Sequence, residues 1–187
     1  METIVKFAKV HPNAKIPSKR EEDMGFDIYA CFDEDYIEIS PHETKLIPTG
    51  IASVCSSGYG FLFEERGSTG SKGIAKRCGV IDSGFRDQWF VCLTNTTNKP
   101  LFVSKLPKEE LVKTLTAPQE DGDFMTNIFR GMSGAYYENS IVYPYEKAIV
   151  QALVVQVPKV TVEEISYEEL KQIPSERGMG QLGSSNK

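Results

Sequence analysis

The sequence predicts an all-β fold, a distorted barrel or jelly roll assembled from many short strands. Apolar and polar residues alternate in short stretches such as Thr3–Lys9 and Phe61–Phe63, a pattern typical of strands with one buried face. Clusters rich in Pro, Gly, Ser and Asn separate these stretches and predict turns, for example at Ser40–His42 and Asn98–Pro100. Many short strands joined by such turns favour a barrel or jelly roll.

Two kinds of strand are expected along the chain. Alternating stretches predict half-buried strands at Thr3–Lys9, Tyr36–Ile39, Lys45–Ile47 and Phe61–Phe63. Two almost continuous apolar runs, Trp89–Leu93 and Ala148–Val157, suit strands buried on both faces. The 187 residues are enough for one domain, which we expect to span residues 1–187.

An insert of about residues 105–140 interrupts the strand pattern. Within it, Leu111 and Leu115 lie one helical turn apart, as do Phe124 and Ile128, which predicts short helices at Lys108–Leu115 and Asp123–Arg130. The runs on either side, Leu101–Val103 and Ala148–Val157, look like neighbouring strands that a short turn could join. We therefore expect that residues 106–140 can be removed without loss of the fold.

The C-terminal region predicts a short helix followed by a mobile tail. Ser166 and Glu169 have the spacing of a capping box, so a helix is expected over Ser166–Ile173, and Pro174 ends it. The tail, about residues 175–187, is rich in Gly and Ser and has few apolar residues. We expect it to be mobile until a ligand is bound.

Composition excludes several classes of protein. The net charge of −5 argues against a nucleic-acid-binding domain. No apolar run approaches the roughly 18 residues of a membrane span. The four cysteines are far apart in the sequence, which disfavours a zinc site. The first nine residues lack the apolar core of a secretory signal, so a cytoplasmic protein is expected.

Three segments carry residues suited to chemistry. Glu65–Gly73 combines glycines, hydroxyls, an Arg and a Lys, which can bind phosphate, although a surface turn would look similar. Asp82 follows an apolar strand in Gly79–Arg86 and could activate a water molecule, or simply begin a β-turn. Arg177 opens a Gly-rich tail that could close over a ligand, or could be a frayed terminus.

Taken together, five segments resemble the five motifs of the homotrimeric dUTP diphosphatase (dUTPase) family. They occur in the family's order, at Met24–Ala30, Arg66–Lys72, Gly79–Arg86, Lys147–Gln151 and Arg177–Ser185. The resemblance implies a jelly roll and a homotrimer whose active sites are shared between subunits. It also implies hydrolysis of dUTP to dUMP and pyrophosphate with Mg²⁺, an ion held by the substrate phosphates and water, so that no metal-ligating residue is expected.

The resemblance assigns roles by position. Asp82 would activate the attacking water, Arg66 and Ser68 would hold phosphate oxygens, and Gln151 would bond near the α-phosphate. Asp27 would orient the site and pair with the tail, and Arg177 would clamp the γ-phosphate. The other implied substrate-binding residues are Gly67, Thr69, Gly79, Val80, Ile81, Phe85, Gly178, Leu182, Gly183, Ser184 and Ser185.

Several positions depart from the family pattern. The second motif reads Arg-Gly-Ser in place of Arg-Ser-Gly, so the phosphate-binding hydroxyl could belong to Ser68 or Thr69. Phe85 stands where the family has Tyr, and its ring can still stack on deoxyribose. In the family, Gly-Asp-Arg precedes the fourth motif. Here the corresponding residues are Tyr145-Glu146-Lys147, which are displaced by one position. Leu182 replaces a Phe that stacks on uracil, and should cover the base less well.

Two alternative functions stay open. A dCTP deaminase shares the fold, but it needs a glutamate where this chain has Cys92. A jelly-roll protein with a regulatory role could instead bind a protein partner through the insert. Its aromatic residues would either cover the barrel or contact that partner; they are Phe124, Phe129, Tyr136 and Tyr137.

Overall fold

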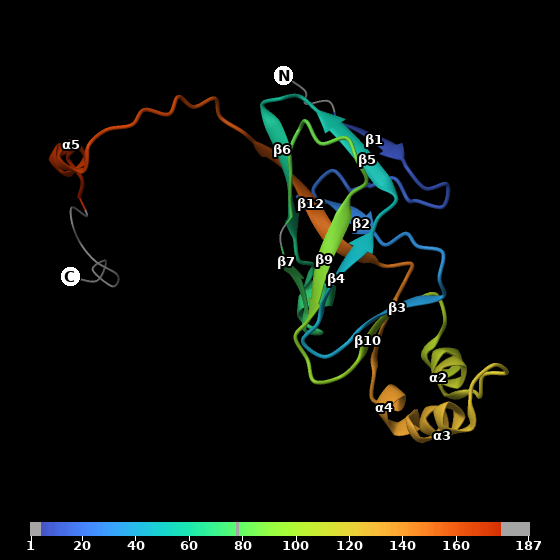
Figure 1. The fold of residues 1–187 in the computed structure, drawn as a ribbon. Coiled ribbons are helices and arrows are strands. Elements are labelled where there is room, and N and C mark those ends of the chain that lie inside the picture. Colours follow the sequence, from blue (N-terminus) through green and yellow to red (C-terminus); the bar gives the residue numbers. More distant parts are fainter. Residues whose placement is uncertain (1–4, 78, 177–187) are drawn as a thin grey trace. The chain divides into compact units, whose positions relative to one another are not determined.

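The computed structural model describes residues 5–77 and 79–176, and it confirms the all-β class. The chain divides into two compact units, one ending at Val157 and one beginning at Pro158, and each is described by itself. Figure 1 shows the strands of the first unit. They are β1 (Val5–Lys9), β2 (Gly25–Tyr29), β3 (Tyr36–Ile39), β4 (Thr44–Pro48), β5 (Ile51–Cys55), β6 (Tyr59–Glu64), β7 (Ile74–Arg77), β8 (Val80–Ile81), β9 (Phe90–Asn95), β10 (Leu101–Ser104), β11 (Ile141–Pro144) and β12 (Ala148–Gln156).

The strands of the described residues form four sheets around one core. Their orders are β2-β12-β6-β8, β4-β9-β7, β11-β10-β3 and β1-β5. Trp89 lies at the centre of the core, fully buried, with its ring 4.9 Å from that of Phe61 and 5.4 Å from that of Phe63. Phe7 of β1 packs on the same indole. Edge-to-face contacts between rings therefore join strands β1 and β6 to the centre of the core.

All the strands expected from the sequence are present, but the expected burial is only partly correct. In β12, residues Ala148–Val150 are buried, whereas Val154 and Val155 are half-buried. In β9, Phe90 is 45% exposed. Both strands are thus covered on two faces over only part of their length.

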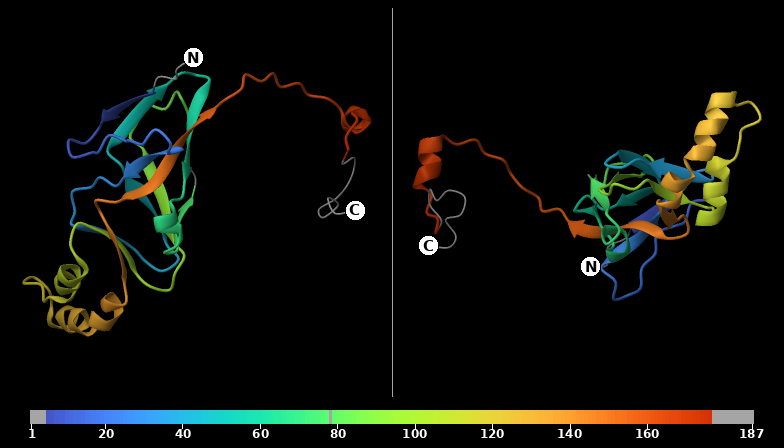
Figure 2. Two further views of the ribbon diagram at one scale, coloured as in Figure 1. Left: turned by 180° about the vertical axis from the view of Figure 1, so that it is seen from behind. Right: turned by 90° about the horizontal axis from the view of Figure 1, so that it is seen from below.

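The insert folds into three helices that lie together beside one end of β3 and β10 (Figures 1 and 2). They are α2 (Lys108–Thr116), α3 (Phe124–Met132) and α4 (Gly134–Glu138). The first two were expected, and α4 was not. Leu111 and Leu115 of α2 are buried against Phe102 of β10, so the amphipathic spacing correctly identified the face of α2 that packs.

The expectation that the strands flanking the insert are neighbours is wrong. β10 pairs with β3 and β11, whereas β12 pairs with β2 and β6. β10 and β11 are parallel, with Leu101 opposite Ile141 and Ser104 opposite Pro144. Because a parallel pair needs a crossover of a dozen or more residues, a short turn cannot replace residues 106–140 without losing this pairing.

The unit that begins at Pro158 contains helix α5 (Tyr167–Gln172). The expected capping box is present: Ser166 Oγ accepts a hydrogen bond from the Glu169 backbone N–H, and Glu169 Oε2 accepts one from the Ser166 backbone N–H. The helix ends at Ile173, before Pro174, as expected. Among the described residues, no helix is both long and apolar enough to cross a membrane.

The packing of α2 on β10 predicts a large effect of Leu111→Ala. This fully buried side chain lies in the cluster with Phe102, so its truncation should cost about 2–5 kcal/mol of unfolding free energy. Thermal unfolding would measure the loss, with Lys113→Ala on the same helix as the control. An unchanged melting temperature for Leu111→Ala would show that α2 does not stabilise β10.

Candidate functional site

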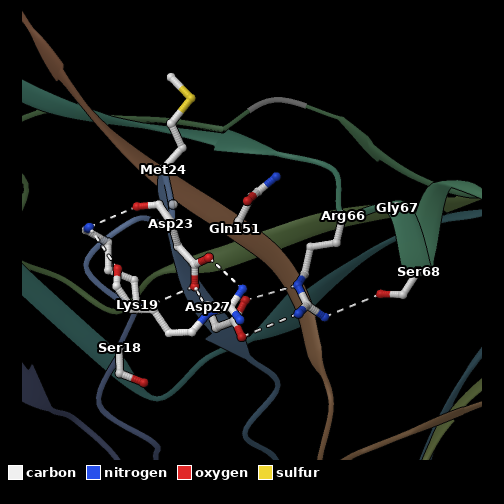
Figure 3. Close-up of a pocket in the computed structure, with 11 residues that line it drawn as sticks. Ser18, Lys19, Asp23, Met24, Asp27, Arg66, Gly67, Ser68 and Gln151 are labelled. Atoms are coloured by element: carbon white, nitrogen blue, oxygen red, sulfur yellow. Dashed lines mark hydrogen bonds and ion pairs between the residues drawn. The ribbon is translucent and has the colours of Figure 1, made fainter.

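A pocket of about 720 Å³ gathers several of the predicted residues (Figure 3). Its walls come from strands β2 and β12, from helix α1 (Gly67–Gly70) and from the loop that precedes β2. The predicted residues Asp27, Arg66, Gly67, Ser68 and Gln151 are brought together here. The remaining lining residues are Ser18, Lys19, Arg20, Asp23, Met24 and Gly25.

The pairing of β12 places Gln151 between β2, which carries the first family-like segment, and β6, which directly precedes the second. Gln151 lies opposite Asp27 on β2 and opposite Glu64 on β6. Its amide Nε2 donates to the carbonyl oxygen of Glu65, 2.9 Å away. A Cβ on Gly25 would meet Gln151 Oε1 at 2.9 Å, so only glycine allows Gln151 to pack this closely.

Arg66 is held by an ion pair and by neutral acceptors. Its Nε lies 3.0 Å from Asp27 Oδ1, and its Nη2 donates to Asp27 Oδ2 at 3.4 Å. Nη1 donates to Ser68 Oγ and to the carbonyl of Ala148. Figure 3 shows Arg66 and Asp27 pointing toward each other. Both side chains are about one-third exposed, so the charges of the pair remain accessible to a ligand.

Of the two hydroxyls that the sequence left open, the one in the pocket is that of Ser68. Thr69 is buried, and its Oγ1 accepts from the Arg66 N–H and donates to the Arg66 carbonyl. It therefore shapes the turn into α1. Ser68 lines the pocket and accepts from Arg66, so its exposed hydroxyl can reach a phosphate oxygen.

The fourth segment contains an irregularity in its strand pairing. The pairing of β12 with β2 shifts between Ala148 and Val150, where Ala148 pairs with Tyr29 and Val150 with Ile28. A β-bulge accommodates one extra residue without moving the rest of the register. Gln151 therefore still lies opposite Asp27, although Lys147 is displaced by one position in the sequence.

The sequence analysis missed the loop at residues 18–24. It begins at Ser18, whose carbonyl accepts from the Asp27 N–H, so its base is tied to β2. Lys19 Nζ donates to the carbonyl oxygens of Arg20, Glu21 and Asp23. The sequence analysis assigned these charged residues no role, and only the fold places them in the pocket.

Tyr143 is a second residue that the sequence analysis missed. It is buried on β11, and its hydroxyl donates to the Ala148 carbonyl at 2.7 Å. The same carbonyl accepts from Arg66, and the Tyr143 hydroxyl lies 3.5 Å from Ser68 Oγ. The strand that follows the insert thus contacts a residue that lines the pocket, Ser68, and shares an acceptor with another, Arg66.

The segment with Asp82 lies away from this pocket. Asp82 is exposed and begins a turn in which its carbonyl accepts from the Phe85 N–H. Ile81 pairs with Phe61 on β6, whereas Gln151 pairs with Glu64 on the other side of β6. At about 3.4 Å per residue and 4.8 Å per strand, the Cα of Asp82 is roughly 16 Å from that of Gln151.

Four other predicted residues lie near Asp82, in β8 or in the segments next to it. They are Gly79, Val80, Ile81 and Phe85. Gly79 adopts φ +151°, and a Cβ there would meet Phe63 Cβ at 2.7 Å. Glycine is therefore required where the chain enters β8. Phe85 is 41% exposed, so part of its side chain is accessible to a ligand.

The remaining predicted residues lie outside the described part of the chain. They are Arg177, Gly178, Leu182, Gly183, Ser184 and Ser185. Within residues 5–77 and 79–176, no group of three His, Cys, Asp or Glu side chains could hold a metal ion. An ion bound through the oxygens of a triphosphate and water needs no such group.

Comparison with known proteins assigns the chain to a family. The dUTPase family model matches residues 12–108, just over half of the chain. The deoxyuridine 5'-triphosphate nucleotidohydrolase of Nautilia profundicola is 32% identical over 118 residues, 61% of this chain and 80% of that protein. The Mycolicibacterium gilvum enzyme of the same name is 29% identical over 110 residues, 56% of this chain and 70% of that protein. For some other bacterial relatives, the match spans only 56 to 66% of their length.

The fold is also similar to that of a solved dUTPase. The Staphylococcus bacteriophage 80alpha dUTPase with dUpNHpp superposes with a TM-score of 0.67 at 18% identity, over 97% of this chain and 98% of that one. At this identity the likeness bears on the fold alone. Together with the matched family model and the bacterial relatives, it leads to one assignment: this chain belongs to the dUTPase family.

Proposed function

We propose that the protein hydrolyses dUTP to dUMP and pyrophosphate. The observation that carries this proposal is the pocket, where three segments far apart in the sequence place two arginines, two serines and a glutamine around one space. Such a set suits a phosphate chain, because guanidinium groups and hydroxyls bind its oxygens. Deamination of dCTP is not favoured, since Cys92 on β9 cannot act as the proton shuttle that this reaction needs.

Arg66, Ser68 and Gln151 hold the phosphates in this proposal. Water attacks the α-phosphorus, a new P–O bond forms, and the bond to the β-phosphate oxygen breaks to release pyrophosphate. Positioning and charge stabilisation supply most of the catalysis of such a transfer. Magnesium, when bound by the phosphate oxygens, offsets part of the developing charge. Asp27 keeps the Arg66 guanidinium oriented through its ion pair.

Asp82 would act on substrate bound to a neighbouring copy of the chain. Its distance of roughly 16 Å from Gln151 prevents both residues of one chain from reaching the same phosphate. A trimer with shared sites, proposed here for this chain, would join the Asp82 turn of one subunit to the phosphate pocket of the next. Asp82 would then accept the proton of the attacking water.

The base and sugar would bind beside Asp82. Among the described residues β8 is the last strand of its sheet, and an edge strand directs some backbone N–H and C=O groups away from the strand it pairs with. Gly79, Val80 and Ile81 can therefore bond to uracil through the backbone. The exposed ring of Phe85 would cover the deoxyribose and disfavour a 2′-hydroxyl.

The C-terminal residues are assigned by the family resemblance. Arg177 and Gly178 would close over the γ-phosphate, Leu182 would cover the base, and Gly183, Ser184 and Ser185 would add phosphate contacts. The tail would be a lid that excludes water during the reaction. We also propose that the enzyme acts in the cytoplasm, where its nucleotide substrate is present.

A protein-binding role of the insert is a second proposal. Helix α3 has no buried residue, and Phe124, Phe129 and Met132 are 78%, 63% and 74% exposed. Large apolar side chains grouped on one exposed helix are typical of contact surfaces. This role would be additional to dUTP hydrolysis, because these residues do not line the phosphate pocket.

Pyrophosphate release from dUTP, dCTP, dTTP and UTP, measured side by side, tests the activity. We expect rapid release from dUTP alone. Asp82→Asn should keep dUTP affinity and lower turnover about a hundredfold or more, the scale of losing a general base. Asp87→Asn, in the same loop, is the matched control. Near-normal turnover of Asp82→Asn would remove Asp82 from the reaction.

Mixing two inactive variants tests whether subunits share the site. Arg66→Ala and Asp82→Asn should each be nearly inactive alone. In a random equal mixture, one site in four combines an intact pocket with an intact Asp82, so about a quarter of the activity should return. Two affinity tags would verify that mixed trimers form. If mixed trimers form but remain inactive, Arg66 and Asp82 of the same subunit contribute to one site.

Tyr143→Phe tests the support of the pocket by β11. Loss of the hydroxyl removes a hydrogen bond to the Ala148 carbonyl, worth about 0.5–1.5 kcal/mol, and loosens Arg66 and Ser68. We expect KM for dUTP to rise about threefold to tenfold with a smaller change in kcat. Tyr136→Phe on α4 is the control. If Tyr143→Phe lowers the melting temperature but leaves KM unchanged, Tyr143 stabilises the core and does not support the pocket.

A further inference from the structure

We propose that Arg20 is a further substrate-binding residue, which contacts the outer phosphates of the nucleotide and is held by Asp23 until the nucleotide enters. The inference rests on the proposed function, because it concerns the same pocket. None of the five family-like segments includes Arg20. The proposal comes from the position of the loop at residues 18–24, which forms one wall of the pocket.

The loop is built to hold its shape without Arg20. Lys19 Nζ donates to three carbonyl oxygens within the loop, at 2.8 to 3.2 Å, which satisfies all three of its protons. The carbonyl of Ser18 is bonded to the Asp27 N–H. Figure 3 shows Lys19 and Asp23 on the side of Asp27 that faces away from Ser68. Lys19 is therefore a positioning residue, committed to the loop and not available to a ligand.

Arg20 makes a bidentate pair with Asp23. Its Nε donates to Oδ2 at 2.9 Å, and its Nη2 donates to Oδ1 at 2.8 Å. The hydrogen bond from Arg20 lowers the pKa of the Asp23 carboxyl to about 2, so the carboxylate stays charged at neutral pH. The hydrogen bond to Asp23 and the charge of Asp23 raise the pKa of Arg20, and the charge of Asp27 adds to this shift.

The Arg20–Asp23 pair is poised for exchange. The Arg20 side chain is 87% exposed, and an exposed ion pair in water contributes little stability. A triphosphate offers the same planar fork more negative charge and several oxygens. Arg66, in contrast, is partly buried and bonded to Asp27, Ser68 and Ala148. Of these two arginines, Arg20 can move to the ligand with fewer bonds lost.

The charge of the pocket supports the same conclusion. Its lining holds three cations, on Lys19, Arg20 and Arg66, and two carboxylates, on Asp23 and Asp27. A triphosphate carrying about four negative charges needs more compensation than one excess positive charge provides. If phosphate replaces Asp23 as the partner of the Arg20 guanidinium, the arginine charge becomes available to the ligand, and Asp23 keeps its hydrogen bond from the Arg20 backbone N–H.

Binding to the full-length protein tests the proposal, with the non-hydrolysable analogue dUpNHpp and dUMP as probes. Arg20→Ala should weaken dUpNHpp binding about tenfold and change dUMP binding less than twofold, because dUMP lacks the outer phosphates. Asp23→Asn should tighten dUpNHpp binding about threefold at low salt, since it frees Arg20. Arg20→Ala/Asp23→Asn should lose that gain. Lys113→Ala is the control for removal of an exposed cation.

We expect Arg20→Ala and Asp23→Asn to change the affinity for dUpNHpp in opposite directions. This difference distinguishes a role of Arg20 in binding from a role in the structure of the loop. If the pair only shaped the loop, Asp23→Asn would weaken dUpNHpp binding as Arg20→Ala does, and that result would overturn the proposal. Wild-type affinity of Arg20→Ala for dUpNHpp would overturn it as well. Turnover of dUTP by the wild-type enzyme is measured first. Its absence would refute the proposed function, whereas normal turnover with an unaffected Arg20→Ala refutes only the role of Arg20.

Discussion

The register of β12 is the constraint on which the site depends. This strand pairs with β2 on one side and with β6 on the other, and Gln151 lies where the two pairings meet, opposite Asp27 and Glu64. A slip of one residue would turn every side chain of β12 to the opposite face, and Gln151 would leave the pocket. The bulge between Ala148 and Val150 protects that register, because it accommodates the extra residue before Gln151.

The insert is part of the fold and not an appendage. Its helices form the crossover between the parallel strands β10 and β11, and α2 buries Leu111 and Leu115 on Phe102. The crossover delivers Tyr143 next to the pocket, where its hydroxyl and Arg66 share the Ala148 carbonyl. The pocket that we propose to bind phosphate therefore depends on a segment without any residue of the five family-like motifs.

Local signals in the sequence predicted local structure well. Alternation located the half-buried strands, apolar spacing located α2 and α3, and the capping box located the start of α5. What could not be predicted depends on distant pairing. The partners of β10 are chosen across a long crossover, so adjacency in the sequence was misleading. The loop with Lys19 and Arg20 lines the pocket only because Ser18 is bonded to Asp27, a contact that leaves no pattern in the sequence.

The arrangement of the central sheet favours the proposed site shared between copies of the chain. The residues proposed to bind phosphate lie on β2, on β12 and at the start of α1, whereas Asp82 follows β8, beyond β6. Loops can move, but β8 is fixed by its pairing with β6 at Phe61 and Leu62. A closure that brought Asp82 to its own pocket would have to break this pairing and expose Ile81, which is buried. Contact between copies requires no such loss, so a shared site is the arrangement that leaves the sheet intact.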